Sequence, residues 1–275
     1  MNYPISVFDL DGTLTNSKKE ITPGTREALR RYQEAGGIVV LASGRPTPGV
    51  LPVAKELELD KTGGYILAFN GGFVQDCRTG EIIYKAILPE GIPQRMYDFA
   101  KAHDVKILTY EENVIITEDP EDIYTLQEQL NNNMEIQKVD SFKDYVRFPV
   151  EKCLITGEPN HLAGVEKILN AEVGEILSVY RADPYFLEVM PKGIEKASSL
   201  QRLLDHLGMT REEMAAFGDG FNDIGMIKFA GLGVAMANAQ DVVKKEAQHI
   251  TLSNEEDGVA CVLHKFVDGT FQPGC

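Results

Sequence analysis

Near the N-terminus the chain reads ISVFDLDGTL over residues 5–14. The first four residues form a largely apolar run of strand length, and two carboxylates, Asp9 and Asp11, come soon after it. Side chains two residues apart in a strand point to the same side, and Gly12 lets the backbone turn sharply just beyond. Both carboxylates can therefore converge at the mouth of a sheet, where a divalent cation would offset their repulsion. Asp-Gly is also a common turn pair. Taken alone, this stretch is therefore consistent with either a cation-binding site or a simple turn.

The overall charge argues against two classes of partner. The 275 residues contain 27 Lys and Arg against 42 Asp and Glu, which gives a formal net charge of −15. A nucleic acid or an anionic membrane surface would meet net repulsion, so we expect neither as a partner. No apolar run approaches the ~18 residues of a membrane span.

The cysteine pattern indicates free thiols. Cys77, Cys153, Cys261 and Cys275 form no Cys-x-x-Cys pair, and none has a His neighbour at zinc-site spacing. The chain begins with a strand and shows no basic region or cleavable apolar segment at its start. We therefore expect a protein of a reducing compartment, the cytoplasm.

The first part of the chain alternates strands and helices. Apolar runs at residues 38–41 and 65–69 are typical of strands covered on both faces, and a helical pattern follows the N-cap Thr22. This alternation is the doubly wound α/β pattern, in which ligands bind at the carboxyl ends of the strands. Two of those ends carry polar or glycine-rich stretches, Ser43-Gly44-Arg45 and Asn70-Gly71-Gly72.

The pattern changes after about residue 82. From there to about residue 185, mixed strand candidates alternate with helical patterns, and acidic and amide residues are dense. This predicts an α+β module, residues 83–185, inserted into a core domain formed by residues 1–82 and 186–275. The apolar run at residues 186–190 is interpreted as a strand of the core. A later short strand, residues 215–217, ends in Gly218-Asp219-Gly220-Phe221-Asn222-Asp223.

These polar strand ends match the needs of phosphoryl transfer. That reaction requires a nucleophile, a divalent cation, cationic groups for the phosphate oxygens and an acid for the leaving group. Each residue type is ordinary by itself, as part of a turn, a loop or a solvated helix. Their joint occurrence at strand ends and a helix start favours a site made of Asp9, Asp11, Ser43, Lys196, Asp219, Asn222 and Asp223.

The same motifs resemble a known family. Asp-Leu-Asp-Gly-Thr-Leu, Ser-Gly-Arg, Lys196 and Gly-Asp-Gly-Phe-Asn-Asp are similar, in this order, to the four motifs of the haloacid dehalogenase (HAD) superfamily. The large insert is similar to the C2B cap of the Cof-type phosphatases, subfamily IIB. The resemblance covers essentially the whole chain. It implies a Rossmann-like parallel sheet, strand order 3-2-1-4-5, with an inserted α+β cap that sets substrate specificity.

The resemblance also implies catalytic roles. Asp9 would be the nucleophile that forms an aspartyl-phosphate, and Asp11 would be the general acid and then the base that activates water. Ser43 would bind a phosphate oxygen. Lys196 would hold both the phosphate and the Asp9 carboxylate. A few loop positions depart from the usual pattern, because Ala197 and Ala237 stand where members often carry Gly.

Mg²⁺ is the cofactor that the resemblance implies. The metal would be bound by the Asp9 carboxylate, the Asp11 backbone carbonyl and Asp219, while Asn222 and Asp223 would support that shell. Further substrate contacts are assigned to Gly12, Gly44, Arg45, Asn70, Asn222, Arg181 and Tyr185. For Arg45 a structural role is an equal alternative, and Arg181 and Tyr185 could instead belong to an ordinary polar hinge.

The function expected from these features is a Mg²⁺-dependent phosphatase acting on small phosphate monoesters, sugar phosphates foremost. A phosphomutase of the phosphomannomutase type is an alternative, because those enzymes share this kind of cap. A catalytically silent phospho-ligand sensor is a third possibility, although pure binding would need neither Asp9 nor Asp11. The expected partner is a small phosphorylated metabolite, and the protein would be a monomer or a homodimer.

Overall fold

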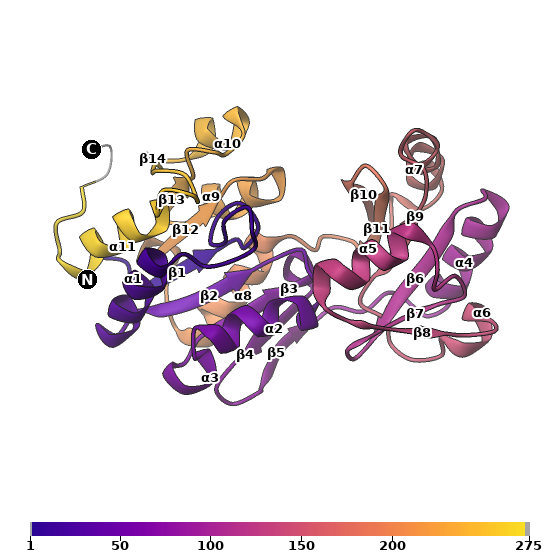
Figure 1. The fold of residues 1–275 in the computed structure, drawn as a ribbon, viewed down its shortest axis with the longest axis horizontal. Coiled ribbons are helices and arrows are strands. Elements are labelled where there is room, and N and C mark those ends of the chain that lie inside the picture. The colour runs from indigo at the N-terminus through magenta and orange to yellow at the C-terminus, as the bar shows by residue number, and fades with distance from the viewer. Residues whose placement is uncertain (1, 273–275) are drawn as a thin grey trace. The chain divides into compact units, whose positions relative to one another are not determined.

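The computed structural model describes residues 2–272 and divides them into two compact units. The first unit contains residues 2–44, 50–84 and 195–272, and the second contains residues 45–49 and 85–194. In Figure 1 the indigo and violet N-terminal part and the orange and yellow C-terminal part build the first unit, and the magenta middle of the chain builds the second. The chain thus leaves the first unit and returns to it.

The first unit contains an eight-stranded sheet. Its order is β14-β13-β12-β1-β2-β3-β4-β5. From one edge to the other the strands are β14 (His249–Ile250), β13 (Leu232–Ala235), β12 (Met214–Gly218), β1 (Ile5–Phe8), β2 (Ile38–Ala42), β3 (Tyr65–Ala68), β4 (Phe73–Asp76) and β5 (Ile82–Lys85).

The strands from β14 to β3 run parallel, and β4 pairs antiparallel with β3. Taking β1, β2, β3, β12 and β13 as strands one to five, the parallel order is the expected 3-2-1-4-5. Phe8 at the end of β1 is in register with Leu41 of β2 and Phe217 of β12. Parallel strands end at the same edge, so the residues that follow β1, β2, β3 and β12 are brought together there.

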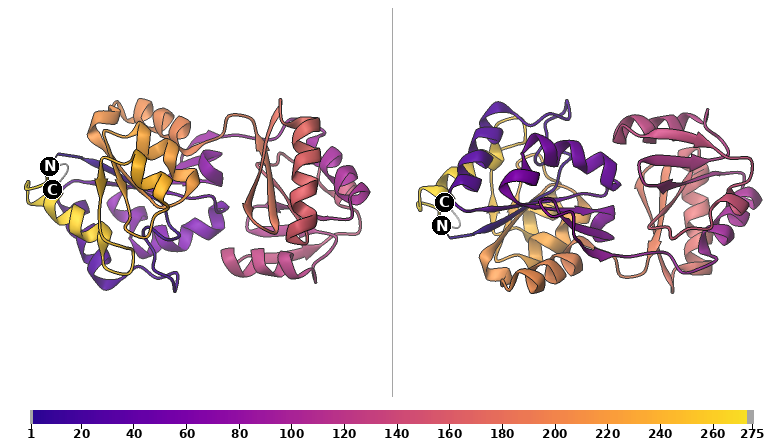
Figure 2. Two further views of the ribbon diagram at one scale, coloured as in Figure 1. Left: turned by 90° about the horizontal axis from the view of Figure 1, so that it is seen from above. Right: turned by 90° about the horizontal axis from the view of Figure 1, so that it is seen from below.

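Helices cover both faces of this sheet (Figure 2). They are α1 (Pro23–Glu34), α2 (Thr47–Glu56), α3 (Leu59–Thr62), α8 (Lys196–Leu207), α9 (Ile224–Phe229), α10 (Asp241–Glu246) and α11 (Gly258–Val267). Three 3₁₀ turns lie at Phe69–Gly71, Arg211–Glu213 and Phe221–Asp223. Helix α1 begins as its sequence predicts, with Pro23 in its first turn and the Thr22 side chain accepting from the backbone N–H of Thr25.

The core of the first unit is split by its sheet. On one face Val7, Val40 and Ala216 pack against Leu200 and Leu203 of α8 together with other apolar side chains. On the other face Ser6 donates to the hydroxyl of Tyr32 in α1, and Phe217 meets Phe266 of α11 edge to face. Burial on both faces explains why these strands read as nearly continuous apolar runs.

The second unit is a six-stranded sheet with its own helices. The sheet order is β10-β11-β9-β6-β7-β8. The strands are β10 (Leu177–Asp183), β11 (Phe186–Pro191), β9 (Cys153–Thr156), β6 (Lys106–Glu111), β7 (Val114–Thr117) and β8 (Glu135–Lys138), and the helices are α4 (Ile92–Ala102), α5 (Ile123–Asn132), α6 (Phe142–Tyr145) and α7 (Pro159–Val173).

This sheet has a separate apolar core on one face. Met96 and Phe99 of α4 and Leu162 of α7 pack with Ile107 of β6 and Leu187 of β11. The β10–β11 and β6–β7 pairs are antiparallel, as is the pairing of β9 with β6 and β11. The unit is therefore an α+β module, as predicted, whereas the mostly parallel sheet of the first unit with helices on both faces is of the α/β class.

The prediction for residues 186–190 was wrong. This run forms β11, which pairs with β10 and β9 of the second sheet and not with any strand of the first. The second unit therefore extends to Ile194, whereas the sequence pattern placed the return to the core at Phe186. An apolar strand of this length fits either sheet, and only the pairing of distant strands distinguishes the two.

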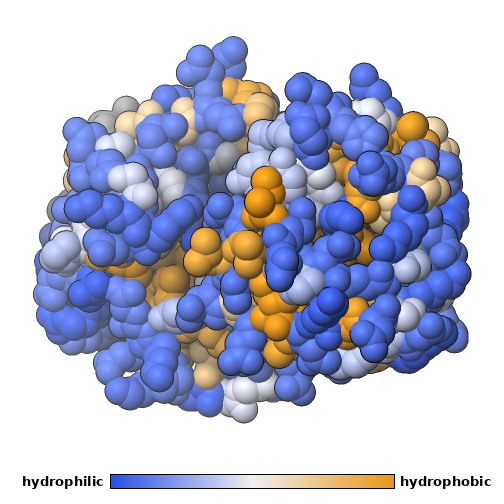
Figure 3. Space-filling view, turned by 45° about the vertical axis from the view of Figure 1, so that its right-hand side comes forward, coloured by the Kyte–Doolittle hydropathy of each residue, from blue (hydrophilic) through white to orange (hydrophobic). Residues whose placement is uncertain are grey.

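Figure 3 shows a face on which hydrophilic side chains predominate and apolar side chains gather in smaller groups. Within residues 2–272, no helix is both long and apolar enough to cross a membrane. Cys77, Cys153 and Cys261 are free thiols as expected, and Cys275 lies outside the described residues.

Candidate active site

The carboxyl ends of four neighbouring strands hold most of the expected residues. Asp9 directly follows β1, Ser43 follows β2, Asn70 lies just after β3, and Asp219 follows β12. The backbone N–H of Asp9 still donates to the carbonyl of Phe217 at 3.0 Å, so the β1 and β12 ends stay side by side up to the first carboxylate. The position of the site therefore follows from the parallel sheet.

Lys196 lies between two carboxylates. It opens α8, is only 1% exposed, and its Nζ lies 2.6 Å from Oδ1 of Asp9 and 2.6 Å from Oδ1 of Asp223. A charge buried this deeply is tolerated because two carboxyl groups accept hydrogen bonds from it. Lys196 and Asp9 are brought together as the sequence predicted.

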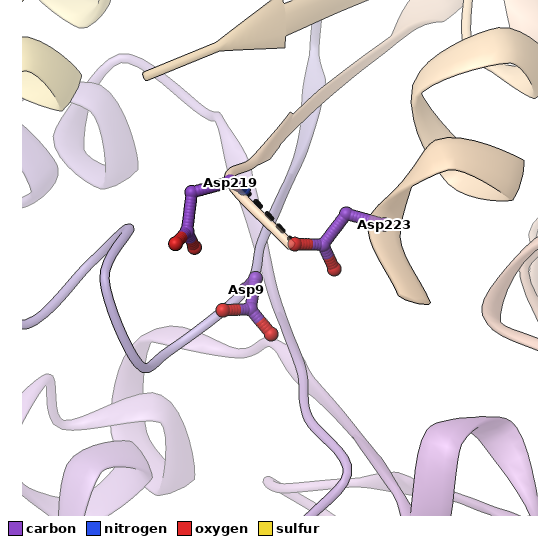
Figure 4. Close-up of side chains that lie close together, drawn as sticks. All are labelled: Asp9, Asp219 and Asp223. Carbon is purple, nitrogen blue, oxygen red and sulfur yellow. Dashed lines mark hydrogen bonds between the residues drawn. The ribbon is translucent and has the colours of Figure 1, made fainter. Parts of the chain in front are cut away.

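Three carboxylates converge beside this lysine. Asp9, Asp219 and Asp223 each offer an oxygen, and these oxygens lie within 4.8 Å of one another (Figure 4). Oδ1 of Asp223 is the atom that accepts from Lys196, and its Oδ2 accepts from the backbone N–H groups of Asp219 at 3.0 Å and Gly220 at 2.9 Å. Asp223 thus braces the loop that carries Asp219, while Asp9 and Asp219 face each other. Hard carboxylate oxygens gathered in this way fit Mg²⁺.

The electrostatics of the cluster show an excess of negative charge. Burial and the neighbouring Asp223 carboxylate raise the pKa of Asp9 to about 8, against the pull of Lys196. Burial also raises the pKa of Asp219 to about 6. For Lys196, burial lowers the pKa, but the attraction of Asp223 and Asp9 outweighs it, so its pKa is raised. The lysine therefore stays charged, and one cation does not neutralise three carboxylates. A divalent metal would offset the remaining charge.

The turn after Asp9 is packed directly against Asp219. Gly12 has a positive φ of 85°, and a Cβ on it would lie 2.4 Å from Oδ2 of Asp219. The hydroxyl of Thr13 donates to Oδ1 of the same carboxylate at 2.8 Å. The side chain of Asp11 is not part of the three-carboxylate group. Its Oδ1 instead lies 2.5 Å from the Nζ of Lys19.

Four further residues with expected phosphate or substrate contacts lie close together in the first unit. Ser43 is 2% exposed and Asn70 is 6% exposed, and the backbone N–H of Asn70 donates to the carbonyl of Ser43 at 2.9 Å. A Cβ on Gly44 would lie 3.1 Å from Nδ2 of Asn70. The Asn222 amide donates to Oδ1 of Asn70 at 3.2 Å. Ser43, Gly44, Asn70 and Asn222 therefore form one polar group.

The remaining substrate-contact candidates belong to the second unit. Arg45 donates from Nη1 to the carbonyl of Gly49 at 3.2 Å. Arg181 in β10 donates from Nε to Glu166 of α7 at 2.8 Å. The ring of Tyr185 stacks on that of Tyr124, with centroids 5.1 Å apart. Their proposed contacts with substrate stay predictions.

Three residues of the site were given no role from the sequence. Thr13 lies inside the first motif, and this position could have indicated that it contacts the site residue Asp219. Lys19 has a positive φ of 64°, which directs a side chain eight residues downstream back to Asp11, and nothing in the sequence indicates this. Asn238 donates to the carbonyl of Gly12 at 2.7 Å, and its position beside Ala237 is the one feature of the sequence that could have directed attention to it.

Comparison with known proteins identifies the family of this chain. Residues 6–263 match the family of haloacid dehalogenase-like hydrolases. The chain is 33% identical over 268 residues to the 5-amino-6-(5-phospho-D-ribitylamino)uracil phosphatase YcsE of Bacillus subtilis, with 97% of both chains covered.

Solved structures of haloacid dehalogenase-like proteins have the same fold. A haloacid dehalogenase-like hydrolase from Bacteroides thetaiotaomicron is 48% identical, with a TM-score of 0.93 over 96% of this chain and 99% of the other. A structure described as a HAD subclass IIB sugar phosphatase is 26% identical, with a TM-score of 0.80 over 97% of this chain and 99% of the other. The chain therefore belongs to the haloacid dehalogenase-like hydrolases and is a phosphatase.

Proposed function

We propose that this phosphatase is Mg²⁺-dependent and hydrolyses small phosphate monoesters, sugar phosphates foremost, through an aspartyl-phosphate on Asp9. The observation that carries the proposal is the meeting of buried Asp9 and half-buried Asp219, at the ends of β1 and β12, with buried Lys196 at the start of α8. Its chemistry suits attack on phosphorus, because a carboxylate, a fixed cation and a second carboxylate for a metal meet at one point.

The first half-reaction would transfer the phosphoryl group from the substrate to Asp9. A carboxylate oxygen of Asp9 attacks phosphorus, the bond from phosphorus to the ester oxygen breaks, and Asp11 donates its proton to the leaving alcohol. Lys196 keeps the Asp9 carboxylate in place and binds a phosphate oxygen, and Ser43 donates to another. Asn70, Asn222 and the backbone at Gly12 and Gly44 complete the phosphate-side contacts.

The second half-reaction would regenerate Asp9. Asp11, now a carboxylate, takes a proton from water as that water attacks phosphorus, and the bond from phosphorus to Asp9 breaks to release inorganic phosphate. Mg²⁺ held by the Asp9 and Asp219 carboxylates and the Asp11 carbonyl would supply positive charge against the phosphoryl oxygens, with Asp223 and Asn222 supporting its ligands.

We further propose that the second unit selects the substrate. The groups assigned to the first unit contact phosphate and metal, which all phosphate monoesters share, so another part must distinguish the leaving groups. Arg181 and Tyr185 are the candidates in this unit, and Arg45 is a third. The relatives support a hydroxyl-rich substrate, because one is named for a phosphorylated ribityl compound and another is described as a sugar phosphatase. A site built to hydrogen-bond hydroxyls rejects analogues that lack them.

The nucleophile is tested by Asp9→Asn, which keeps the shape of the side chain and removes its charge. We expect nearly all turnover of a sugar phosphate to be lost, and acid-quenched wild-type protein, but not the variant, to carry a phosphoryl group on Asp9 by mass spectrometry. Asp60→Asn, on an exposed residue of α3, is the matched control. If Asp9→Asn kept more than about a tenth of the wild-type kcat, its activation free energy would have risen by less than ~1.4 kcal/mol, and the mechanism would be contradicted.

The substrate class is tested by a screen of phosphate monoesters with Mg²⁺. The screen includes hexose and pentose phosphates, a ribityl phosphate and an aryl phosphate, and it measures both inorganic phosphate and isomerised sugar phosphate. We expect release of inorganic phosphate, with kcat/KM higher for the polyhydroxylated esters. Isomerised sugar phosphate as the main product would instead establish a mutase.

A further inference from the structure

A short segment after β13 connects the two loops of the candidate active site. Residues 236–240 follow β13, and the backbone N–H of Met236 donates to the carbonyl of Gly218 at 3.1 Å. The backbone N–H of Gln240 donates to the carbonyl of Asp219, also at 3.1 Å. Backbone hydrogen bonds thus fix this segment to the loop that carries Asp219.

The side chain of Asn238 extends from this segment to the other loop. Its Nδ2 donates to the carbonyl of Gly12 at 2.7 Å, and its Oδ1 accepts from the backbone N–H of Asn254 at 3.1 Å. The Asn254 amide in turn donates to the carbonyl of Thr15 at 2.9 Å. Two carboxamides therefore hold the turn after Asp9 at two of its carbonyl groups.

These bonds keep the turn after Asp9 close to the carboxylate of Asp219. Gly12 approaches Asp219 so closely that a Cβ would reach to 2.4 Å of its carboxylate, and Thr13 donates to that carboxylate at 2.8 Å. A shift of a few tenths of an ångström in either loop changes both contacts. The same turn carries Asp11, whose backbone carbonyl is a proposed metal ligand and whose carboxylate is the proposed acid.

We propose that Asn238 is a positioning residue, which fixes the turn of Asp11 and Gly12 at its working distance from Asp219. Asn238 acts through those residues and touches none of the reacting atoms. The proposal rests on the proposed function for its catalytic consequence, but the spacing that it concerns exists in the protein without substrate or metal. Groups that orient metal ligands commonly change metal affinity or activity by about 10- to 100-fold when removed.

A purely structural role predicts something different. The two hydrogen bonds of this exposed side chain together contribute about 1 kcal/mol to folding, which moves the Tm of a protein of this size by only about 2–4 °C. The backbone bonds of Met236 and Gln240 do not depend on the Asn238 side chain, so the segment stays in place when that side chain is shortened. A large loss of function with a small change in Tm therefore indicates positioning.

The experiment compares three variants with the wild-type protein. Asn238→Ala removes both side-chain bonds. Asn238→Asp keeps an oxygen that accepts from Asn254 but replaces the donor to Gly12 with an acceptor. Gln240→Ala shortens an exposed amide in the same segment for which the described chain records no side-chain hydrogen bond, and it serves as the matched control.

Three quantities are measured on each variant. The first of these is steady-state turnover of a sugar phosphate, which gives kcat and KM, the second is the Kd for Mg²⁺ by calorimetry, and the third is amide hydrogen exchange of residues 13–15 in excess chelator. The Tm of each variant is recorded as the control for folding. For both Asn238 variants we expect kcat to fall about tenfold or more, with KM changed by less than about threefold. We expect Mg²⁺ to bind several-fold more weakly and the amides of residues 13–15 to exchange faster, with Tm within about 4 °C of the wild-type value.

The result that overturns the proposal is Asn238→Ala with kcat, Mg²⁺ affinity and exchange all within about twofold of wild type, or with losses that Gln240→Ala reproduces. A loss of function accompanied by a fall in Tm of more than about 10 °C also overturns it, because that indicates a folding role. If the wild-type protein itself has no Mg²⁺-dependent turnover, the proposed function fails, while the exchange of residues 13–15 still decides whether Asn238 holds the turn.

Discussion

Gly12 lies against the carboxylate of Asp219 with no room for a side chain between them. A Cβ at position 12 would lie 2.4 Å from Oδ2 and 2.9 Å from Cγ of Asp219. The backbone of Gly12 also has a positive φ of 85°, which side-chain-bearing residues rarely adopt. Glycine is therefore required at this position for two separate reasons, and they can be measured separately.

The first prediction separates them with two alanine variants. Gly80 has a similar φ of 74°, but a Cβ on it would meet nothing within 4 Å, so Gly80→Ala bears only the backbone cost of about 1 kcal/mol. Gly12→Ala bears the same cost and must also displace Asp219. We expect a lower Tm in both variants, but a loss of turnover of about tenfold or more only in Gly12→Ala. Normal turnover of Gly12→Ala would show that Asp219 can move without harm.

The second prediction concerns the metal. The surplus of carboxylates over cations at Asp9, Asp219 and Asp223 leads us to expect that excess chelator abolishes turnover, that Mg²⁺ restores it, and that Ca²⁺ inhibits. Ca²⁺ takes more ligands in looser geometry and could occupy both oxygens of Asp9, which would turn the attacking oxygen away from phosphorus. Phosphate release is the measurement, and Asp219→Asn should need more Mg²⁺ for half-maximal rate. Full activity in chelator would remove the metal from the mechanism.

The third prediction concerns pH and the metal-free protein. The pKa of Asp9 is raised from its ordinary value of 3.8 to about 8, chiefly by burial, and that of Asp219 to about 6. Between about pH 4 and pH 8 the folded protein therefore keeps protons that the unfolded chain has released. The unfolded state binds fewer protons in this window, so the free energy of unfolding falls as pH rises.

The measurement is Tm against pH in excess chelator. We expect Tm to fall from pH 6 to pH 8, and Asp9→Asn, which has no carboxyl group to titrate, to lose much of that fall. Asp60→Asn should follow the wild-type curve, because Asp60 is exposed. Added Mg²⁺ should raise Tm most at the alkaline end, where it no longer competes with protons. An Asp9→Asn curve parallel to wild type would place the titration elsewhere.

The convergence of the first-unit residues was predictable because it depends on parallel strand ends. Asp9 and Asp219 each follow a short apolar strand, and ligand-binding residues in doubly wound sheets gather at those ends. Contacts made through local backbone conformation were not predictable. Lys19 reaches Asp11 from a backbone conformation with a φ of 64°. Lysine rarely adopts this left-handed backbone conformation, and no pattern in the sequence predicts it here.

The wrong assignment of β11 has a different physical origin. Any buried strand can contain the apolar residues of this run, which are Phe186, Leu187, Val189 and Met190. The sequence therefore does not indicate to which of the two sheets the strand belongs. Glu188 is the residue of this run that indicates the second sheet. In the second sheet it is 5% exposed and accepts from the Nζ of Lys152 at 2.8 Å. A carboxylate inside an apolar strand needs a buried cation, and the lysine just before β9 was the candidate.

The last prediction concerns substrate choice by the second unit. Arg181 is held by Glu166, which accepts from its backbone N–H at 3.2 Å and from its Nε at 2.8 Å, and Tyr185 is half-exposed on the ring of Tyr124. Both side chains are thus oriented and could read a leaving group. We expect Arg181→Ala and Tyr185→Ala each to lower kcat/KM for a sugar phosphate about tenfold, because hydroxyl partners are lost, and to change kcat/KM for an aryl phosphate by less than about threefold.

Two further variants make this test specific. Arg147→Ala and Tyr145→Ala remove an exposed arginine and an exposed tyrosine from the same unit, and neither should change the ratio of the two kcat/KM values. Tyr185→Phe keeps the ring on Tyr124 and removes only the hydroxyl, so it separates a hydrogen bond to the sugar from the stacking that holds the ring. A loss in Tyr185→Phe equal to that in Tyr185→Ala assigns the discrimination to the hydroxyl. Equal losses on both esters, or none on either for Arg181 and Tyr185, would place substrate recognition outside these residues of the second unit.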